Sequence, residues 1–449
     1  MTAKLDSEVE ETKKLGVKSL KYHSYYKGKV HVELKCPVRS LDDFSVWYTP
    51  GVASASLEIA KDQDLSYEYT NRGNLIAIAS DGSRVLGLGN VGPYAALPVM
   101  EGKALLYKYL GGVDAFPVVL QTHTADELVS AVLNLQPSFG GVNLEDIEAP
   151  KCFAVLEQLR EKASIPVWHD DQQGTATVTL AALINALKVA GKKLQDVTVA
   201  MVGAGAASLA TARLLQEAGL PAGNIVMCDS AGILHPDRED MDKLQLRNHW
   251  KYDVAIRTNK ERKKGGIAEA LEGADVCISA ATPGPGVIKK EWVSRMQKDA
   301  IVFALANPTP EIWPREAKEA GARVVATGRS DFPNQVNNSL VFPAVFRGSL
   351  DVRSKAISDE MCIAAANALS SYAERTGGIS EEHIIPTMED WEVYPEEAAA
   401  VGDMAIRQGL ARIKMPKEEL KELAYAKIER VRKRVKLLMK EGLIPPPPE

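Results

Sequence analysis

The stretch Val202-Gly203-Ala204-Gly205-Ala206-Ala207-Ser208 decides the fold predicted for this chain. An apolar run at residues 197–202 leads into it, and a helical pattern over residues 206–218 follows it. In a strand–turn–helix unit of this kind, the first glycine permits the tight turn and the second lets a pyrophosphate approach the helix N-terminus. The stretch therefore predicts a dinucleotide-binding turn made by Gly203, Ala204, Gly205, Ala206 and Ala207.

The residues around this turn leave the identity of the dinucleotide open. Ser208 stands where a third glycine or alanine is usual, so a tight turn without a ligand is the competing interpretation. Asp229 ends the next predicted strand, where an acid would hold the ribose hydroxyls of NAD, although it could also be a simple turn residue. Arg238 and Lys243 follow and could instead meet the 2′-phosphate of NADP. We expect NAD or NADP as the cofactor.

Apolar runs alternate with helical patterns on both sides of the turn, which is typical of an α/β fold with parallel sheets. Buried strands are predicted at residues 75–79, 116–120, 140–144, 166–169, 224–228, 275–280, 301–305 and 323–326, and an apolar helix at 175–191. We expect an α/β catalytic domain over residues 1–171, beginning with a polar helical arm. A Rossmann-like, doubly wound NAD(P)-binding domain is expected over 172–400, and C-terminal helices with a Pro-rich tail over 401–449.

The composition is that of an ordinary globular protein and excludes several classes of function. The chain has 449 residues, of which 45% are hydrophobic and 25% charged, and its net charge is −5. It has no basic stripe for nucleic acid and no run of about 20 apolar residues that could span a bilayer. The first residues are polar and lack the apolar core of a signal peptide. The five cysteines are scattered, which fits a reducing compartment, so we expect a cytoplasmic protein with a small-molecule substrate.

Two pairs of acids follow predicted strands, at the positions where parallel sheets bind their ligands. Glu145 and Asp146 follow the strand that ends at residue 144, and Asp170 and Asp171 follow the strand that ends at residue 169. Clustered carboxylates repel one another unless a cation is present, and oxygen ligands of this type suit Mg²⁺ or Mn²⁺. Each pair alone is more often a helix cap or a solvated turn, but two such pairs favour a metal site.

Two further residues could take part in chemistry. Tyr48 lies in a loop that Pro50 and Gly51 stiffen, and Lys103 lies at the start of an apolar helix. A lysine that enters a buried helix near a metal could have its pKa lowered enough to act as a base. The competing interpretations are an ordinary packed tyrosine and a lysine whose stem lies along an apolar surface.

In combination, these segments resemble the malic enzymes, specifically the shorter bacterial and archaeal kind without a fused acyltransferase domain. The resemblance covers about residues 45 to 345, and its motifs occur in the order of the family. It is carried by Tyr48-Thr49-Pro50-Gly51-Val52-Ala53, Asp81-Gly82-Ser83-Arg84, Glu101-Gly102-Lys103, Asn143-Leu144-Glu145-Asp146, His169-Asp170-Asp171, the glycine-rich turn, Asn307-Pro308-Thr309-Pro310-Glu311 and Gln335-Val336-Asn337-Asn338.

The resemblance implies a homodimer that converts (S)-malate to pyruvate and CO₂ while it reduces NAD(P). It implies that Mg²⁺ or Mn²⁺ is bound by Glu145, Asp146 and Asp171. Lys103 would be the general base, Asp170 would orient it, and Tyr48 would be the general acid. Arg84 would grip a malate carboxylate, and contacts to the substrate or the nicotinamide would come from Asn307, Asn337 and Asn338.

Two alternatives differ from this hypothesis in what they require. A plain 2-hydroxy-acid or amino-acid dehydrogenase needs no metal. A non-catalytic NAD(P)-sensing protein needs no acid, base or metal, so the presence of Tyr48, Lys103 and the acids argues against it. The sequence leaves open whether Tyr48 and Lys103 meet within one chain or across two subunits.

Overall fold

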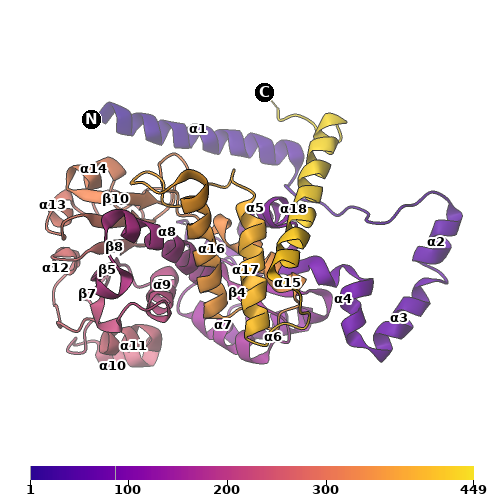
Figure 1. Cartoon of the computed structure of the whole chain (residues 1–449), viewed down its shortest axis with the longest axis horizontal. Coiled ribbons are helices and arrows are strands. Elements are labelled where there is room, and N and C mark those ends of the chain that lie inside the picture. The colour runs from indigo at the N-terminus through magenta and orange to yellow at the C-terminus, as the bar shows by residue number, and fades with distance from the viewer. Residues whose placement is uncertain (1, 86, 449) are drawn as a thin grey trace.

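Two separate sheets organise the chain, of which the computed structural model describes residues 2–85 and 87–448 (Figure 1). The first sheet has the order β2-β1-β3-β4 and consists of β1 (Leu75–Ser80), β2 (Asp114–Val119), β3 (Gly141–Leu144) and β4 (Val167–His169). Neighbouring strands in it are parallel, so their carboxyl ends lie along one edge of the sheet. These four strands confirm the strands predicted upstream of the glycine-rich turn.

The second sheet contains the glycine-rich turn and has the order β10-β9-β8-β5-β6-β7. Its strands are β5 (Val199–Val202), β6 (Ile225–Asp229), β7 (Gly232–Ile233), β8 (Val276–Ser279), β9 (Ala300–Ala304) and β10 (Ala322–Thr327). The short β7, which the sequence did not predict, pairs antiparallel with β6, and the other pairs are parallel. β5 has β6 on one side and β8 on the other, so the turn after β5 lies where the strand order reverses.

The helices fall into three groups along the chain. Before and around the first sheet are α1 (Thr2–Tyr26), α2 (Leu41–Trp47), α3 (Val52–Lys61), α4 (Ser66–Tyr69), α5 (Gly92–Gly111), α6 (Ala125–Leu135) and α7 (Lys151–Lys162). With the second sheet are α8 (Thr175–Ala190), α9 (Ala206–Glu217), α10 (Met241–Arg247), α11 (His249–Arg257), α12 (Ile267–Leu271), α13 (Lys290–Val293) and α14 (Pro314–Glu319). The C-terminal group is α15 (Phe342–Asp351), α16 (Asp359–Gly377), α17 (Val393–Arg407) and α18 (Lys417–Lys440). Two short turns also bear on the site, the π-helical turn η4 (Asp170–Gly174) and the 3₁₀ turn η7 (Asn338–Leu340).

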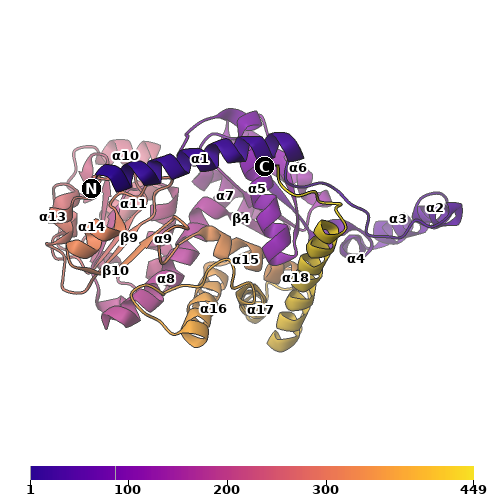
Figure 2. The same ribbon diagram turned by 90° about the horizontal axis from the view of Figure 1, so that it is seen from above.

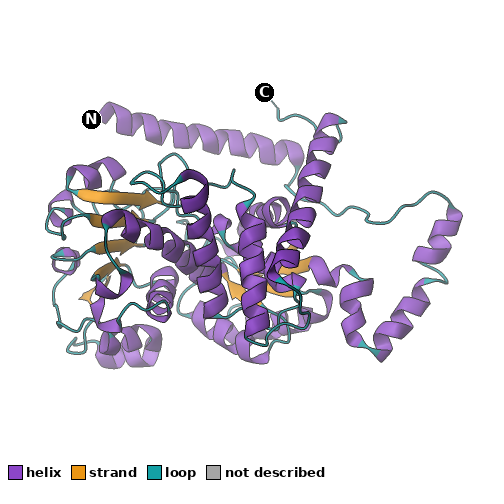
Figure 3. Cartoon of the chain, viewed as in Figure 1, coloured by secondary structure: helices purple, strands orange, loops and turns teal. Residues whose placement is uncertain are grey.

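Helices cover both faces of the second sheet, as the doubly wound prediction requires (Figure 3). Val199 and Met201 of β5 lie in the core that contains α8 and α9, whereas Ala200 and Val202 lie in a second cluster with α12, α13 and α14. Because both faces are buried, the strands are continuous apolar runs rather than alternating ones. α8 ends at Gly191, which has a φ of 66° in the left-handed region and closes the helix as predicted.

The C-terminal helices pack on one another, and α15, α17 and α18 also contact α5, which is far from them in the sequence. A Cβ on Gly111 of α5 would lie 2.6 Å from the backbone oxygen of Pro343 in α15, so these two helices meet backbone to backbone. α18 buries Leu420, Ala424 and Ile428, while Lys433 on its basic run is exposed. The C-terminal helix that the sequence predicts here is therefore a packed surface helix with an exposed basic face.

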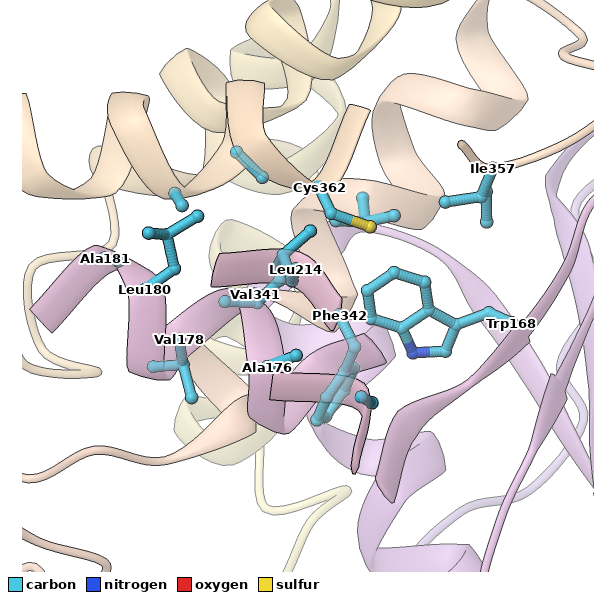
Figure 4. Close-up of a cluster of buried hydrophobic side chains, with 14 of the residues drawn as sticks. Trp168, Ala176, Val178, Leu180, Ala181, Leu214, Val341, Phe342, Ile357 and Cys362 are labelled. Carbon is cyan, nitrogen blue, oxygen red and sulfur yellow. The ribbon is translucent and has the colours of Figure 1, made fainter. Parts of the chain in front are cut away.

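A shared hydrophobic core joins the two sheets. Figure 4 shows Trp168 of β4 and Phe342 of α15 beside Ala176 and Leu180 of α8, with Cys362 of α16 above them. Trp168 and Phe342 are fully buried, and the Trp168 indole N–H donates to Asp170, which follows β4. This core fixes the relative positions of the two carboxyl edges.

The five cysteines are free thiols, and four of them are buried. Burial raises the pKa of Cys152 to about 12, so this thiol stays neutral at physiological pH. Among the described helices, none is long and apolar enough to cross a membrane.

The N-terminal segment forms two arms that lie outside the body of the molecule (Figures 1 and 2). α1 confirms the predicted helical arm and runs along the outside of the two sheets. After it, α2 and α3 form a second arm that projects beyond the first sheet, and none of their residues is buried. The chain rejoins the body at Tyr67 of α4, which is buried.

Candidate active site

The two predicted pairs of acids meet at the carboxyl edge of the first sheet. Glu145 and Asp146 follow β3, and Asp171 lies in η4, which follows the neighbouring strand β4. Glu145, Asp146 and Asp171 each offer a carboxylate oxygen, and these oxygens lie within 4.8 Å of one another. The backbone N–H of Asp146 also donates to Asp171 Oδ2 at 2.9 Å. The spacing predicted that both pairs of acids lie at this edge, because parallel strands end together, whereas the particular set Glu145, Asp146 and Asp171 came from the resemblance to malic enzymes.

A chain of hydrogen bonds that begins at Tyr107 of α5 orients Glu145. Tyr107 of α5 donates its hydroxyl to Asn143 Oδ1 at 2.9 Å, and Asn143 Nδ2 donates to Glu145 Oε2 at 2.8 Å. On the other side, His169 Nε2 lies 3.2 Å from Asp171 Oδ2. Asn143 and His169 stand within the motifs quoted above, but no role is predicted for them from the sequence. The available signal was their spacing: Asn143 stands two residues before Glu145, and His169 stands two residues before Asp171.

The electrostatics of the cluster fit a divalent cation. Burial raises the pKa of Glu145 well above its ordinary value, and the neighbouring carboxylates add to this against the opposing charge of Lys103. Burial would also raise the pKa of Asp171, but the hydrogen bond and charge of His169 outweigh it and lower that pKa. Three crowded carboxylates with hard oxygen donors are the ligand set that Mg²⁺ and Mn²⁺ prefer. The residues present therefore fit such an ion.

Lys103 points from the buried side of α5 into this cluster. Its Nζ lies 2.8 Å from Glu145 Oε1, forms a closer ion pair with Asp170 Oδ2, and lies 4.4 Å from the ring centre of Phe342. Burial alone would lower the pKa of Lys103, but Asp170 and Glu145 outweigh it and hold the pKa above its ordinary value. The lowering of this pKa was predicted for a lysine beside a metal ion and stays a prediction; the two carboxylates by themselves favour the ammonium form of Lys103.

Asp170 is positioned by the π-helical turn that carries it. Its Oδ1 accepts a hydrogen bond from Trp168 Nε1 at 3.0 Å, which leaves Oδ2 for Lys103. A Cβ on Gly174, at the end of the same turn, would lie 2.1 Å from Asp170 Oδ1. Only glycine leaves room for the carboxylate here. Turns of this π type are frequent at functional sites.

The glycine-rich turn has the two properties that a dinucleotide site needs. Gly203 has a φ of 100°, and a Cβ on it would lie 2.7 Å from the backbone oxygen of Ala280, so the tight turn requires glycine. Nothing lies within 4 Å of a Cβ on Gly205, which leaves open space at the N-terminus of α9. The turn η4 packs against α9, so the acids and the glycine-rich turn belong to one region.

Asp229 lies at the end of β6 and is already paired. Its Oδ1 accepts from Arg238 at 3.0 Å and from the backbone N–H of Ala231 at 2.9 Å, while Lys251 Nζ lies 3.4 Å from Oδ2. Sequence reasoning named Arg238 and Lys243 as nearby cations, but Lys251 of α11 is the second cation that the structure brings to Asp229. The acid is thus neutralised by its neighbours.

The loops that follow the strands bring Arg84 and Asn307 toward the site. The backbone N–H of Arg84 donates to the backbone oxygen of Asp146 at 3.0 Å, and its side chain is exposed. A Cβ on Gly87 in the same loop would lie 2.9 Å from the backbone oxygen of Asn307, which follows β9. The carboxyl edges of the two sheets therefore face each other across these loops.

The two later asparagines differ in their surroundings. Asn338 Cβ would lie 3.2 Å from a Cβ on Gly174, so Asn338 is beside the turn that carries Asp170. Asn337 instead caps η7, because its Oδ1 accepts from the backbone N–H of Ser339 at 2.9 Å. Of the two asparagines, Asn338 is therefore the one that lies beside the acid cluster.

Glu311 is a positioning residue that sequence reasoning missed. It is fully buried, and its two oxygens accept from Ser279 Oγ at 2.7 Å, Ala281 N at 2.8 Å and Ala306 N at 3.1 Å. These bonds tie together the loops after β8 and β9, next to the glycine-rich turn. Its place in the Asn307–Glu311 motif was the only signal in the sequence.

Tyr48 is the residue that the structure does not bring to the cluster. It follows α2 on the projecting arm and is 72% exposed. Figures 1 and 2 both show α2 and α3 well away from the carboxyl edge of the first sheet. Within one chain, the proposed acid and the proposed base are therefore apart.

The fold and the site together define a two-sheet α/β protein of the dinucleotide-binding enzyme class, with an acid cluster beside the cofactor turn. Comparison with known families narrows this class: residues 27–160 match the malic enzyme N-terminal domain, and residues 172–406 match the malic enzyme NAD-binding domain. The chain belongs to the malic enzyme family.

Individual relatives agree with this membership over nearly their whole length. The bifunctional malic/malolactic enzyme of Bacillus subtilis is 48% identical over 90% of this chain and 96% of its own. The NAD-dependent malic enzyme of Geobacillus stearothermophilus is 45% identical over 92% of this chain and 85% of its own. The crystal structure of Entamoeba histolytica malic enzyme superposes with a TM-score of 0.93 at 45% identity and covers 98% of this chain and 90% of that one. Other relatives are named NADP-dependent malic enzymes.

Proposed function

We propose that this protein oxidises and decarboxylates (S)-malate to pyruvate and CO₂ while it reduces NAD or NADP. The observation that carries the proposal is the position of Lys103 between Glu145 and Asp170, at the carboxyl edge of the first sheet. The turn that carries Asp170 packs against α9, whose N-terminus is the open glycine-rich turn. A proton-transfer group, hard oxygen ligands and a dinucleotide site thus adjoin, as a metal-assisted hydride transfer requires.

We assign metal binding and proton transfer to different residues of the chain. Glu145, Asp146 and Asp171 would hold Mg²⁺ or Mn²⁺. The bound ion would make the malate hydroxyl more acidic and stabilise the enolate charge after loss of CO₂, and the nicotinamide would accept the hydride. An ion bound to Glu145 would weaken the hold of this carboxylate on the Lys103 ammonium and lower the pKa of Lys103. As the neutral amine, Lys103 Nζ would take the hydroxyl proton, with Asp170 orienting it, and Tyr48 would protonate C3 of the enol.

The remaining proposed contacts concern binding. Arg84 would hold a malate carboxylate, and Asn307 and Asn338 would contact the substrate or the nicotinamide ring, with Asn337 beside them. Because Arg238 and Lys251 neutralise Asp229, its repulsion of a 2′-phosphate is weakened, and we propose that the site accepts both NAD and NADP. The domain boundary near residue 172 and the cytoplasmic location remain predictions of the sequence.

The direct test is an assay of the purified protein with (S)-malate and either NAD or NADP, with and without Mn²⁺. We expect pyruvate and reduced cofactor in equal amounts, and no turnover once a chelator has removed the ion. Activity that survives the chelator, with oxaloacetate as the final product, would identify a plain dehydrogenase. Cofactor binding without any malate-dependent reduction would identify a sensing protein.

A further inference from the structure

Gln172 follows Asp171 in the turn η4, and its side chain is buried. Its amide nitrogen, Nε2, lies 3.3 Å from the backbone oxygen of Cys152 in α7 and 2.8 Å from His169 Nδ1. A backbone oxygen can only accept a hydrogen bond, so the atom that faces both neighbours must be the amide nitrogen and not the amide oxygen. Its two hydrogens then serve both neighbours, and His169 Nδ1 is an acceptor.

The acceptor role of Nδ1 determines which nitrogen of the His169 ring carries the proton. An imidazole ring whose Nδ1 accepts a hydrogen bond carries its proton on Nε2. His169 is fully buried, and Nε2 has no well-aligned hydrogen bond within the described residues. The acceptor within its reach is Asp171 Oδ2, at 3.2 Å. Gln172 therefore directs the ring proton of His169 toward a carboxylate of the acid cluster.

Asp171 Oδ2 also receives a second donor. The backbone N–H of Asp146 donates to the same oxygen at 2.9 Å. Two donors on Oδ2 fix the orientation of this carboxylate and leave Oδ1 for a cation. Carboxylates that bind a metal are ordinarily held by such hydrogen bonds, and their loss typically weakens metal binding about 10- to 100-fold.

We propose that Gln172 is a positioning residue of the metal site and acts on Asp171 by fixing the tautomer of His169. This inference rests on the proposed function, because it takes Asp171 to be one of the three acids that hold a divalent cation. The bond from Gln172 to Cys152 keeps the amide in one orientation, so the proton of the imidazole stays on Nε2. The helix α7 thereby supports the acid cluster without contributing a ligand to it.

Gln172 can be replaced without a large change in packing. It borders a cavity of about 170 Å³ between α7, α9 and α11, which Leu156, Leu209 and Trp250 also line. Methionine has about the length of glutamine, adapts to an apolar wall of this kind, and has no donor for His169 Nδ1. Gln172→Met therefore removes the hydrogen bonds and keeps the side-chain volume.

Binding of Mn²⁺ in the absence of malate and cofactor measures the effect directly, because free Mn²⁺ loses its electron paramagnetic resonance signal when it binds. At constant pH, we expect Gln172→Met to raise the Kd for Mn²⁺ about tenfold or more. The matched control is Gln158→Met on α7, whose side chain bonds to Asp126 and Lys162 and not to the acid cluster. We expect the control to bind Mn²⁺ as the wild type does.

Two substitutions of His169 test the donor itself. The amide nitrogen of a glutamine can take the place of the imidazole Nε2, so His169→Gln keeps a donor for Asp171 Oδ2, whereas His169→Leu removes it. We expect the Kd of His169→Gln to stay within about threefold of wild type and that of His169→Leu to rise about tenfold or more. Equal losses in the two variants would contradict the donor role of His169.

A combination of the two positions separates control of the tautomer from a merely structural tie. An amide has no tautomers to choose between, so Gln172→Met should change the Kd little on the His169→Gln background, although it weakens binding on the wild-type background. If Gln172 acted only by tying η4 to α7, Gln172→Met would weaken binding equally on both backgrounds. That result would overturn the proposal.

The tautomer can also be observed in the metal-free protein. Long-range ¹⁵N–¹H spectra of the chain labelled at its seven histidines distinguish a ring nitrogen that carries a proton from one that does not. The signals that His169→Gln lacks belong to His169. We expect the proton on Nε2 in the wild type and a mixture of both tautomers in Gln172→Met. A wild-type proton on Nδ1 would contradict the proposal.

The Mn²⁺ titrations also separate this inference from the proposed function. Wild-type protein that binds no Mn²⁺ would contradict the metal site and, with it, the proposed function. If the wild type binds Mn²⁺ and Gln172→Met binds it as tightly as Gln158→Met, only the role of Gln172 is overturned.

Discussion

The two glycines of the dinucleotide turn have separable roles at the scale of single residues. Gly205→Val puts a side chain into open space at the N-terminus of α9, so the fold should remain while the pyrophosphate loses its place. We expect the KM for NAD to rise about tenfold or more with an unchanged Tm. Gly203→Ala instead clashes with the Ala280 backbone at a positive φ and should destabilise the protein by about 1–3 kcal/mol. Equal effects of both substitutions on Tm would contradict this division.

Gly174 is predicted to control the base without touching the substrate. Gly174→Ala would displace the Asp170 carboxylate, which breaks its hydrogen bond from Trp168 and shifts Lys103. Because a misplacement of about 1 Å can reduce a rate about 100-fold, we expect kcat to fall by that order while NAD affinity stays unchanged. Steady-state kinetics and cofactor fluorescence measure the two quantities. Asp170→Asn should give a similar loss, and a Gly174→Ala variant with wild-type kcat would remove Asp170 from the mechanism.

Among the helices, α17 carries a buried acid that should oppose folding at neutral pH. Glu397 is fully buried, and neither carboxylate oxygen has a hydrogen-bond partner among the described residues. Burial raises its pKa well above the ordinary value of 4.5, so the folded protein keeps the proton that the unfolded chain releases. The stability from this group is therefore complete below pH 4.5 and falls as the pH rises toward the folded pKa.

Glu397→Gln removes this titration and should stabilise the protein increasingly with pH. We expect the difference in free energy of unfolding between variant and wild type to grow by about 1.4 kcal/mol per pH unit above pH 4.5, until the folded pKa is reached. Urea unfolding between pH 5 and pH 8 measures it. The neighbouring Glu396→Gln is the control, because Arg375 and Lys421 pair with Glu396 and lower its pKa. A constant difference across this range would contradict the buried-acid argument.

The sequence predicted the strands and the acid cluster because both depend on local patterns. Apolar runs bounded by turns marked the strands, and the rule that parallel strands end together brought the two pairs of acids to one edge, while the resemblance selected Glu145, Asp146 and Asp171. The carboxylates that raise the pKa of Lys103, Glu145 and Asp170, come from two other elements, so the local pattern around Lys103 does not indicate them. The π-helical turn and the role of Gly174 also depend on contacts that no local pattern encodes.

For the whole molecule, the contacts between elements distant in the sequence could not be predicted from the pattern of apolar and polar residues. The packing of α15 and α18 on α5 joins the C-terminal helices to the first sheet, and no period in the sequence indicates it. Tyr48 was recognised by its motif, but its place on an arm without buried residues follows only from the three-dimensional path of the chain. Motifs therefore identified the chemical groups, whereas their relative positions follow only from the fold.

The contact between the two carboxyl edges gives a prediction for the whole molecule. A Cβ on Gly87 would lie 2.9 Å from the Asn307 backbone oxygen and 3.5 Å from Pro283 Cγ, so Gly87→Val should wedge the two sheets apart at the site. Because Arg84 lies on one side of this contact and Asn307 on the other, malate turnover should suffer while NAD binding to the second sheet persists.

We expect Gly87→Val to lower kcat/KM for malate about tenfold or more, with the Kd for NAD in the absence of malate unchanged. Steady-state assays and fluorescence titration measure these two constants. Gly266→Ala serves as the control. Its Cβ would make only an ordinary contact of 3.7 Å, with Glu269 Oε2, and both residues belong to the part of the chain that contains the second sheet. Wild-type malate kinetics in Gly87→Val would mean that the two edges need not meet for catalysis, and a parallel loss of NAD affinity would place the damage within the dinucleotide site instead.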